Sequence, residues 1–142
     1  MISLFDVLKQ KNYLELLEKS IKNSNEATET FKNQHLDNIE NFLKTTEIPD
    51  DWYIVLHTTN IDPILHRITV DFDVHNNFLN LMMFSVESYV YEESPHIYIK
   101  DLIIYFKNLT FKTKDYLSKT EFVDVIKVYE IISKQQEKEE LG

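Results

Sequence analysis

Hydrophobic side chains recur with helical spacing near the start of the chain. They lie at Leu4, Phe5, Leu8, Leu14, Leu17 and Ile21, a period close to that of an α-helix. Ser3 with Asp6 resembles a capping box at the beginning of this pattern. The polar stretch 22–26 interrupts it, and a second helical period over 27–43 ends before Pro49, which cannot continue a helix. We therefore expect N-terminal helices.

A second capping box marks the start of a C-terminal element. Ser118 and Glu121 have the required spacing. The apolar residues that follow keep to one helical face, at Phe122, Val125, Ile126, Tyr129 and Ile132. This pattern predicts a C-terminal helix from Lys119, and we expect the polar residues 135–142 to form a solvated tail.

The middle of the chain has the alternation of β-strands. Residues 52–56 are rich in β-forming side chains, and 60–63 (Asn-Ile-Asp-Pro) is typical of a turn. Over 67–75 apolar and polar residues alternate strictly. Asn76 and Asn77 tolerate positive φ and predict a hairpin, after which a strand over about 78–91 returns antiparallel.

The segment 95–109 is ambiguous. Ser94 and Pro95 resemble the cap and first residue of a helix, and Ile99, Leu102, Ile103 and Phe106 have helical spacing. The composition, rich in Ile, Tyr and Phe, favours a strand instead. The spacing favours a helix slightly, with a strand as the alternative. Together these elements predict one α+β domain over 1–142: N-terminal helices, a central antiparallel meander and a C-terminal helix.

Composition excludes several classes of function. The chain has 142 residues, a formal net charge of -9 and no Cys, and its single Gly is Gly142. The acidic balance argues against a general nucleic-acid binder, and the glycine content excludes phosphate-binding loops. The start of the chain lacks a basic signal-peptide segment, and the longest apolar run, 102–106, is too short to cross a membrane. We expect a cytoplasmic protein.

The negative charge is concentrated in the predicted sheet. Residues 48–97 contain eight acids and a single base, Arg67. Such a surface either keeps the protein soluble or forms a docking face for a basic partner, because opposed potentials steer encounter.

Candidate partner-binding residues follow from strand alternation. Asp71, Asp73 and His75 project from one face of their strand. The returning strand brings Phe84, Glu87, Tyr89 and Tyr91 beside them as further charge and aromatic anchors. We expect these seven residues to form the binding site if helices leave that face uncovered. Charge reversal at Asp71 and Asp73 is then expected to weaken binding and to leave the fold intact.

An alternative is a metal-dependent enzyme. Carboxylate oxygens and an imidazole from Asp71, Asp73 and His75 on one face could hold Mg²⁺, Mn²⁺ or Fe²⁺. Such triplets are common on half-exposed strands, and the chain has no histidine pair or serine elbow of a known catalytic motif. We expect no cofactor, no metal and no enzymatic activity.

The outline of the chain resembles the small acidic immunity proteins of bacterial toxin systems. The resemblance lies in an N-terminal helix without a signal, in Pro49-Asp50-Asp51-Trp52-Tyr53 opening an acidic meander, and in the C-terminal helix from Lys119. It implies a cytosolic inhibitor that binds one cognate toxin domain, commonly a basic nuclease, without itself touching nucleic acid or membrane. The alternatives are another inhibitor or adaptor, such as a phage anti-defence protein or a secretion chaperone, and a domain that dimerises through an apolar strand row; we expect a monomer or homodimer.

Overall fold

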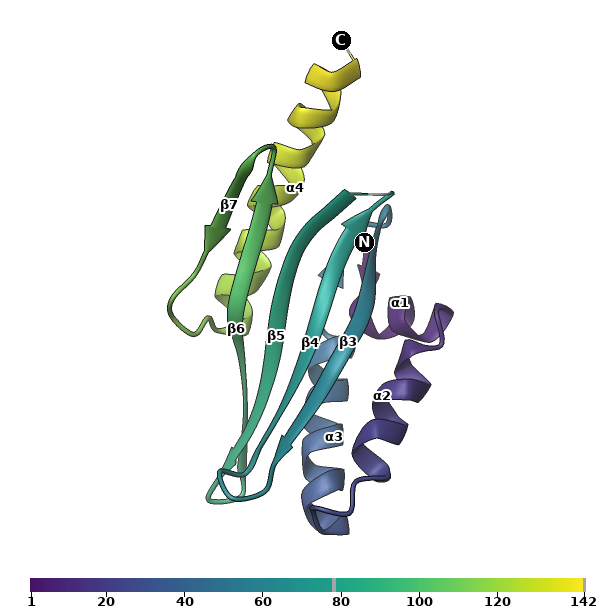
Figure 1. Ribbon diagram of the computed structural model, residues 1–142, viewed down its shortest axis with the longest axis vertical. Helices are drawn as coiled ribbons and strands as arrows, with labels where there is room; N and C mark the ends of the chain where they lie inside the picture. Colours follow the sequence, from purple (N-terminus) through teal and green to yellow (C-terminus); the bar gives the residue numbers. More distant parts are fainter. Residues whose placement is uncertain (78, 142) are drawn as a thin grey trace.

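The computed structural model describes the backbone of residues 1–77 and 79–141 and has the predicted α+β fold (Figure 1). The N-terminal helices are α1 (Leu4–Gln10), α2 (Tyr13–Lys22) and α3 (Glu29–Lys44), and the C-terminal helix is α4 (Lys119–Leu141). Two short strands, β1 (Ile2–Ser3) and β2 (Glu47–Ile48), pair with each other. The main sheet consists of β3 (Trp52–Asp62), β4 (Arg67–Asn76), β5 (Leu79–Tyr91), β6 (Ser94–Phe106) and β7 (Leu109–Lys112). Its five strands form an antiparallel meander in chain order.

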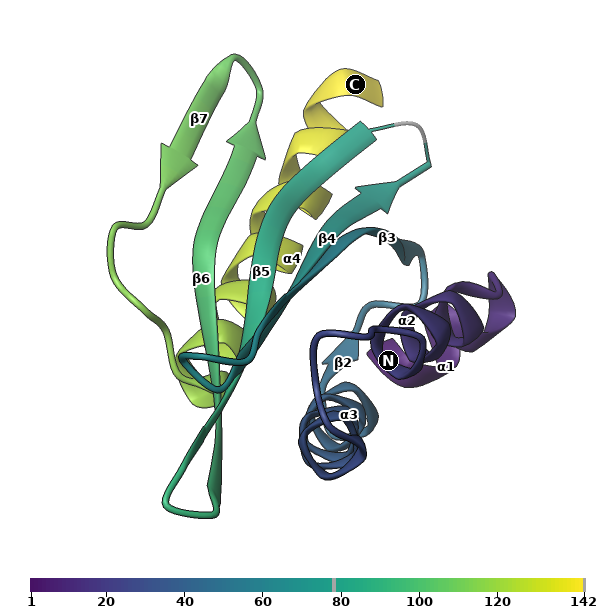
Figure 2. The same ribbon diagram turned by 60° about the horizontal axis from the view of Figure 1, so that its bottom comes forward.

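All four helices pack on the same face of this sheet, as Figure 2 shows. α1 and α2 contact β3, α3 contacts β5 and β6, and α4 contacts β6. The two ends of the helical layer meet in one core, where Phe122 of α4 lies 4.7 Å from Phe84 of β5 and 6.4 Å from Phe42 of α3, ring centre to ring centre. No helix of the described chain lies on the opposite face of the sheet, which we call the open face.

Both predicted capping boxes stand at helix starts. The Ser3 hydroxyl accepts a hydrogen bond from the Asp6 amide at 3.1 Å. At the start of α4, Ser118 accepts from the Glu121 amide at 3.2 Å, and the Glu121 carboxylate accepts from the Ser118 amide at 3.3 Å. The first helical pattern is nevertheless divided, because Asn12 has φ 62° and separates α1 from α2.

The structure corrects the helical prediction for 95–109. These residues lie in β6, the following turn and the start of β7. The strand pairs with β5 on one side and β7 on the other. The helical spacing arises from a bulge: Asp101 has φ 54°, and the register with β5 shifts at this point. Ile99 and Leu102, three residues apart, therefore both face the core.

Two boundaries also differ from the sequence prediction. β3 continues through the predicted turn to Asp62, which pairs with Arg67, and the chain turns over 63–66. The expected tail is helical, since α4 extends to Leu141. The turn after β4 contains Asn77 with φ 54°, whereas Phe78, expected to begin the next strand, lies outside the described residues. Among the described helices, none is long and apolar enough to cross a membrane.

Candidate protein-binding face

Strand register places six of the seven candidate residues on the open face. In β4 the apolar row that includes Phe72 is buried under the helices, so Asp71, Asp73 and His75 project the other way. In the antiparallel register, Asp71 lies opposite Ser85 and Thr69 opposite Glu87. Glu87, Tyr89 and Tyr91 therefore follow Ser85 along the same face of β5.

Phe84 lies on the other side of the sheet. It pairs with Phe72 in the register, and its ring is buried between Phe72 and Phe122 in the core. Because side chains alternate along a strand, Phe84 cannot share a face with Glu87 or Tyr89. The structure thus corrects the prediction for Phe84: its ring packs in the core and is not an exposed anchor of the open face.

Glu87 is held between two cations. Its carboxylate lies 3.8 Å from the Arg67 guanidinium and 3.8 Å from the Lys100 ammonium, and the residue is only 4% exposed. Lys100 comes from β6, where the spacing favoured a helix, and a helix provides no reason to place it beside Glu87. The negative charge of Glu87 is therefore compensated within the face.

Asp73 is enclosed by two histidines. It forms a hydrogen bond with His57 Nε2, and His75 Nε2 lies 3.9 Å from the same carboxylate oxygen. The His75 ring stacks on Tyr53 with a ring-centre separation of 5.3 Å. These neighbours leave Asp73 buried, although no helix covers this side of the sheet.

Asp71 is bonded by two hydroxyl groups of the open face. It accepts hydrogen bonds from the hydroxyls of Thr58 and Ser85, each at 2.5 Å. Its side chain lines a pocket of about 410 Å³ that also contains the exposed Asp101. Neither acid forms an ion pair among the described residues. We call this site the acidic pocket; its walls are completed by His57, Thr58, Phe72, Met83, Phe84, Ser85 and Ile103.

Asp101 was missed by the sequence analysis. A regular strand or helix over 95–109 gives no reason to place it beside Asp71, but the bulge at φ 54° turns it into the pocket. The available sequence signal is an aspartate inside an apolar run. Short polar side chains such as Asp tolerate positive φ better than β-branched ones, so such a position can accommodate a bulge.

Aromatic side chains cover the neighbouring part of the open face. Tyr89 and Tyr91 stack with ring centres 6.3 Å apart, and the ring of His96 lies 6.2 Å from both Tyr89 and Tyr98. Tyr116 meets Tyr98 edge to face at 6.1 Å. Tyr91, Tyr98 and Tyr116 are exposed. Amphipathic rings of this kind are common anchors in protein interfaces.

Two arrangements among the polar groups of the open face would support enzymatic chemistry, a Ser–His–acid relay and a metal site. The hydroxyls of Ser85 and Thr58 bond to Asp71 and not to His57, so they do not form a Ser–His–acid relay. Asp71, Asp73 and His75 do not converge as a metal site: within the described residues no three His, Asp or Glu side chains are placed to hold an ion.

Comparisons with protein-family models, with curated protein sequences and with solved structures found no match to this chain. Inference of its function therefore begins from the chemistry of the open face, which is that of an acidic pocket beside a row of tyrosines.

Proposed function

We propose that this protein binds a basic protein partner through the open face of its sheet. The acidic pocket carries the proposal, because Asp71 and Asp101 line one concave site and neither forms an ion pair with a described residue. A lysine or arginine side chain of the partner would enter this pocket and pair with both carboxylates. Partial desolvation there makes such a charge-assisted contact stronger than one on a flat, solvated surface.

The surrounding residues have supporting roles. Asp73 and Glu87 are already paired with groups of the chain itself, so they fix the shape of the face and are not contacts for the partner. The exposed Tyr91 and Tyr98 would provide buried area next to the pocket. This division differs from the sequence-based hypothesis, in which Asp71, Asp73 and Glu87 all paired with the partner.

The resemblance to immunity proteins suggests what the partner is. A toxin nuclease holds phosphates with Lys and Arg side chains, and an acidic pocket can occupy those side chains in place of the substrate. We therefore propose an immunity protein that neutralises one cognate toxin domain. A phage anti-defence protein or a chaperone would use the same surface, and a toxin gene adjacent to this one would favour immunity over both.

Purification of the protein from its native host with the bound partner tests the proposal. Three baits are compared: the wild type, the pocket variant D71N/D101N, and the control E26Q/D37N, which removes the same charge from exposed positions outside the sheet. We expect the wild type and the control to retain one basic protein that the pocket variant loses. Retention of the same protein by the pocket variant, or an acidic partner, would contradict the proposal.

A further inference from the structure

Helix α4 has two apolar faces on opposite sides. Phe122, Ile126 and Tyr129 are buried against the sheet and α3. On the other side Val128 is 57% exposed and Ile131 61% exposed, with nothing in the described chain covering them. A helix that is apolar on two opposite sides is typical of one packed between two partners. The fold supplies only one of these partners.

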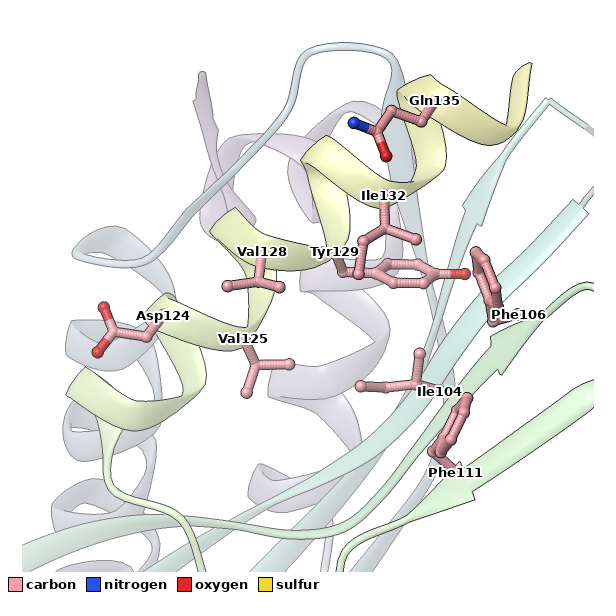
Figure 3. A pocket seen from close by; sticks show the side chains of 9 residues that line it. All are labelled: Ile104, Phe106, Phe111, Asp124, Val125, Val128, Tyr129, Ile132 and Gln135. Carbon is pink, nitrogen blue, oxygen red and sulfur yellow. The ribbon is translucent and has the colours of Figure 1, made fainter. Parts of the chain in front are cut away.

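An apolar groove runs along the flank of this exposed side (Figure 3). It has a volume of about 630 Å³ and lies between α4 and the strands β6 and β7. Val125, Val128 and Ile132 form its helical wall, and Ile104 and Phe111 come from the strands. Phe111 is itself 53% exposed at the edge of the sheet. The groove and the exposed side of α4 therefore form one continuous apolar surface.

The exposed side of α4 has the spacing of a coiled-coil seam. Intervals of three and four residues alternate along it, at Glu121, Asp124, Val128, Ile131, Gln135 and Lys138. All six residues are exposed. The seam is chemically polarised: its N-terminal end is acidic, its centre is apolar, and its C-terminal end carries an amide and a cation.

This polarity is complementary to itself in the antiparallel direction. When two copies of α4 align antiparallel, Val128 lies opposite Ile131 of the other copy. The same alignment places Glu121 opposite Lys138 and Asp124 opposite Gln135, which are an ion pair and a hydrogen-bonding pair. A parallel alignment would instead place Glu121, Asp124 and Lys138 each opposite its own copy, which is repulsive.

We propose that the covering partner is a second copy of this chain, bound through an antiparallel α4–α4 contact that borders the groove beside Phe111. A two-fold axis between Val128 and Ile131 generates every seam pair twice, as an isologous interface requires. The paired segment, about 25 Å long at 1.5 Å per residue, is short for an obligate dimer, so we expect association to depend on concentration. The contact is on the helical side of the sheet, so both open faces stay accessible.

Sedimentation equilibrium of the full chain from low micromolar to near-millimolar concentration tests the interface. We expect the apparent mass to rise from 17.0 kDa towards twice that value. V128D/I131D should remain monomeric at every concentration with an unchanged circular dichroism spectrum, since both side chains are exposed. The control I64D replaces an apolar residue that is 93% exposed in the β3–β4 turn, and it should associate like the wild type. A monomeric wild type, or a V128D/I131D variant that still dimerises, would overturn the proposal.

Disulfide crosslinking distinguishes the antiparallel arrangement from any other. The chain has no cysteine, so introduced thiols report only on their own positions. We expect D124C and Q135C to crosslink when mixed under mild oxidation, and each variant alone to remain uncrosslinked. Crosslinking of D124C with itself would indicate a parallel pair and contradict the proposal. Neither outcome depends on whether the open face binds a basic protein.

Discussion

Ser85 on β5 lies directly opposite Asp71 on β4 and donates a hydrogen bond to its carboxylate at 2.5 Å. A hydroxyl donor orients a carboxylate without neutralising its charge. Asp71 is therefore fixed at the wall of the acidic pocket by neutral donors, whereas Glu87, two residues beyond Ser85, lies between Arg67 and Lys100. The two kinds of acid on this face are expected to respond differently to substitution.

Charge reversal separates the two roles. Asp73→Lys would place a cation in a nearly buried site beside His57 and His75. We expect it to lower the free energy of unfolding by about 3 kcal/mol, the cost of a buried unpaired charge. Asp71→Lys, at a half-buried position, should change stability by less than about 1 kcal/mol. Urea denaturation measures both, and equal losses would contradict this division. The expectation of an intact fold is thus revised for Asp73.

Stability should depend on pH through His35. Burial, and then the nearby charge of His66, lower the pKa of His35 to about 4 from 6.5. The imidazole bonds to Ser88 at 2.7 Å and to His66 at 3.0 Å in the core. Because the unfolded chain takes up a proton near pH 6.5 and the folded chain does not, stability is fully present above that pH and falls as the pH decreases towards 4.

Between pH 6.5 and pH 4 we expect His35 to change the free energy of unfolding by about 3 kcal/mol. The free energy of unfolding is measured from urea curves at several pH values between 4 and 7. In H35Q the free energy of unfolding should lose this part of its pH dependence. In H96Q, at a half-buried position on the open face, it should keep it. An unchanged slope in H35Q would show that other groups are responsible.

The β5–β6 turn should be stabilised by glycine. Glu92 and Glu93 connect Tyr91 to its partner Ser94 and have φ of 49° and 65°. Two-residue hairpin turns with positive φ at both positions favour Asn-Gly, because a side chain with Cβ is strained there. We expect E93G to raise the free energy of unfolding by about 1 kcal/mol, or the melting temperature by about 3 °C. A melting temperature that falls in E93G would contradict this account of the turn.

The sequence predicted the fold class because the strongest patterns were local. The alternation over 67–75 and the capping box of Ser118 and Glu121 depend on neighbouring residues, and the structure has both. The β6 strand was expected only as the alternative to a helix, because a bulge at Asp101 imitates helical spacing. The break at Asn12 was missed although the sequence contains a signal for it. Leu8 and Leu14 are separated by six positions, which is not a whole number of 3.6-residue turns, so the apolar residues before and after Asn12 do not keep one helical phase.

The candidate site was predicted less completely, because it depends on pairing between strands. Alternation was sufficient to place Asp71, Asp73 and His75 on one face. It could not show that Lys100 neutralises Glu87 or that Phe84 faces the core, since both follow from the register of β5 with its neighbours. Counting the acids of a strand therefore overestimates the negative charge that a partner can contact. Asp101 belongs to the site only because of the bulge.

The most direct test is an NMR titration of the ¹⁵N-labelled protein with a tetra-arginine peptide blocked at both ends. A tetra-glutamate peptide is the control ligand, and E26Q/D37N is the control protein. We expect salt-sensitive shifts at His57, Asp71, Ser85 and Asp101 with tetra-arginine only, retained in E26Q/D37N and lost in D71N/D101N. Shifts confined to α1–α3, or the same shifts in D71N/D101N, would contradict the claim that the acidic pocket receives a cationic side chain.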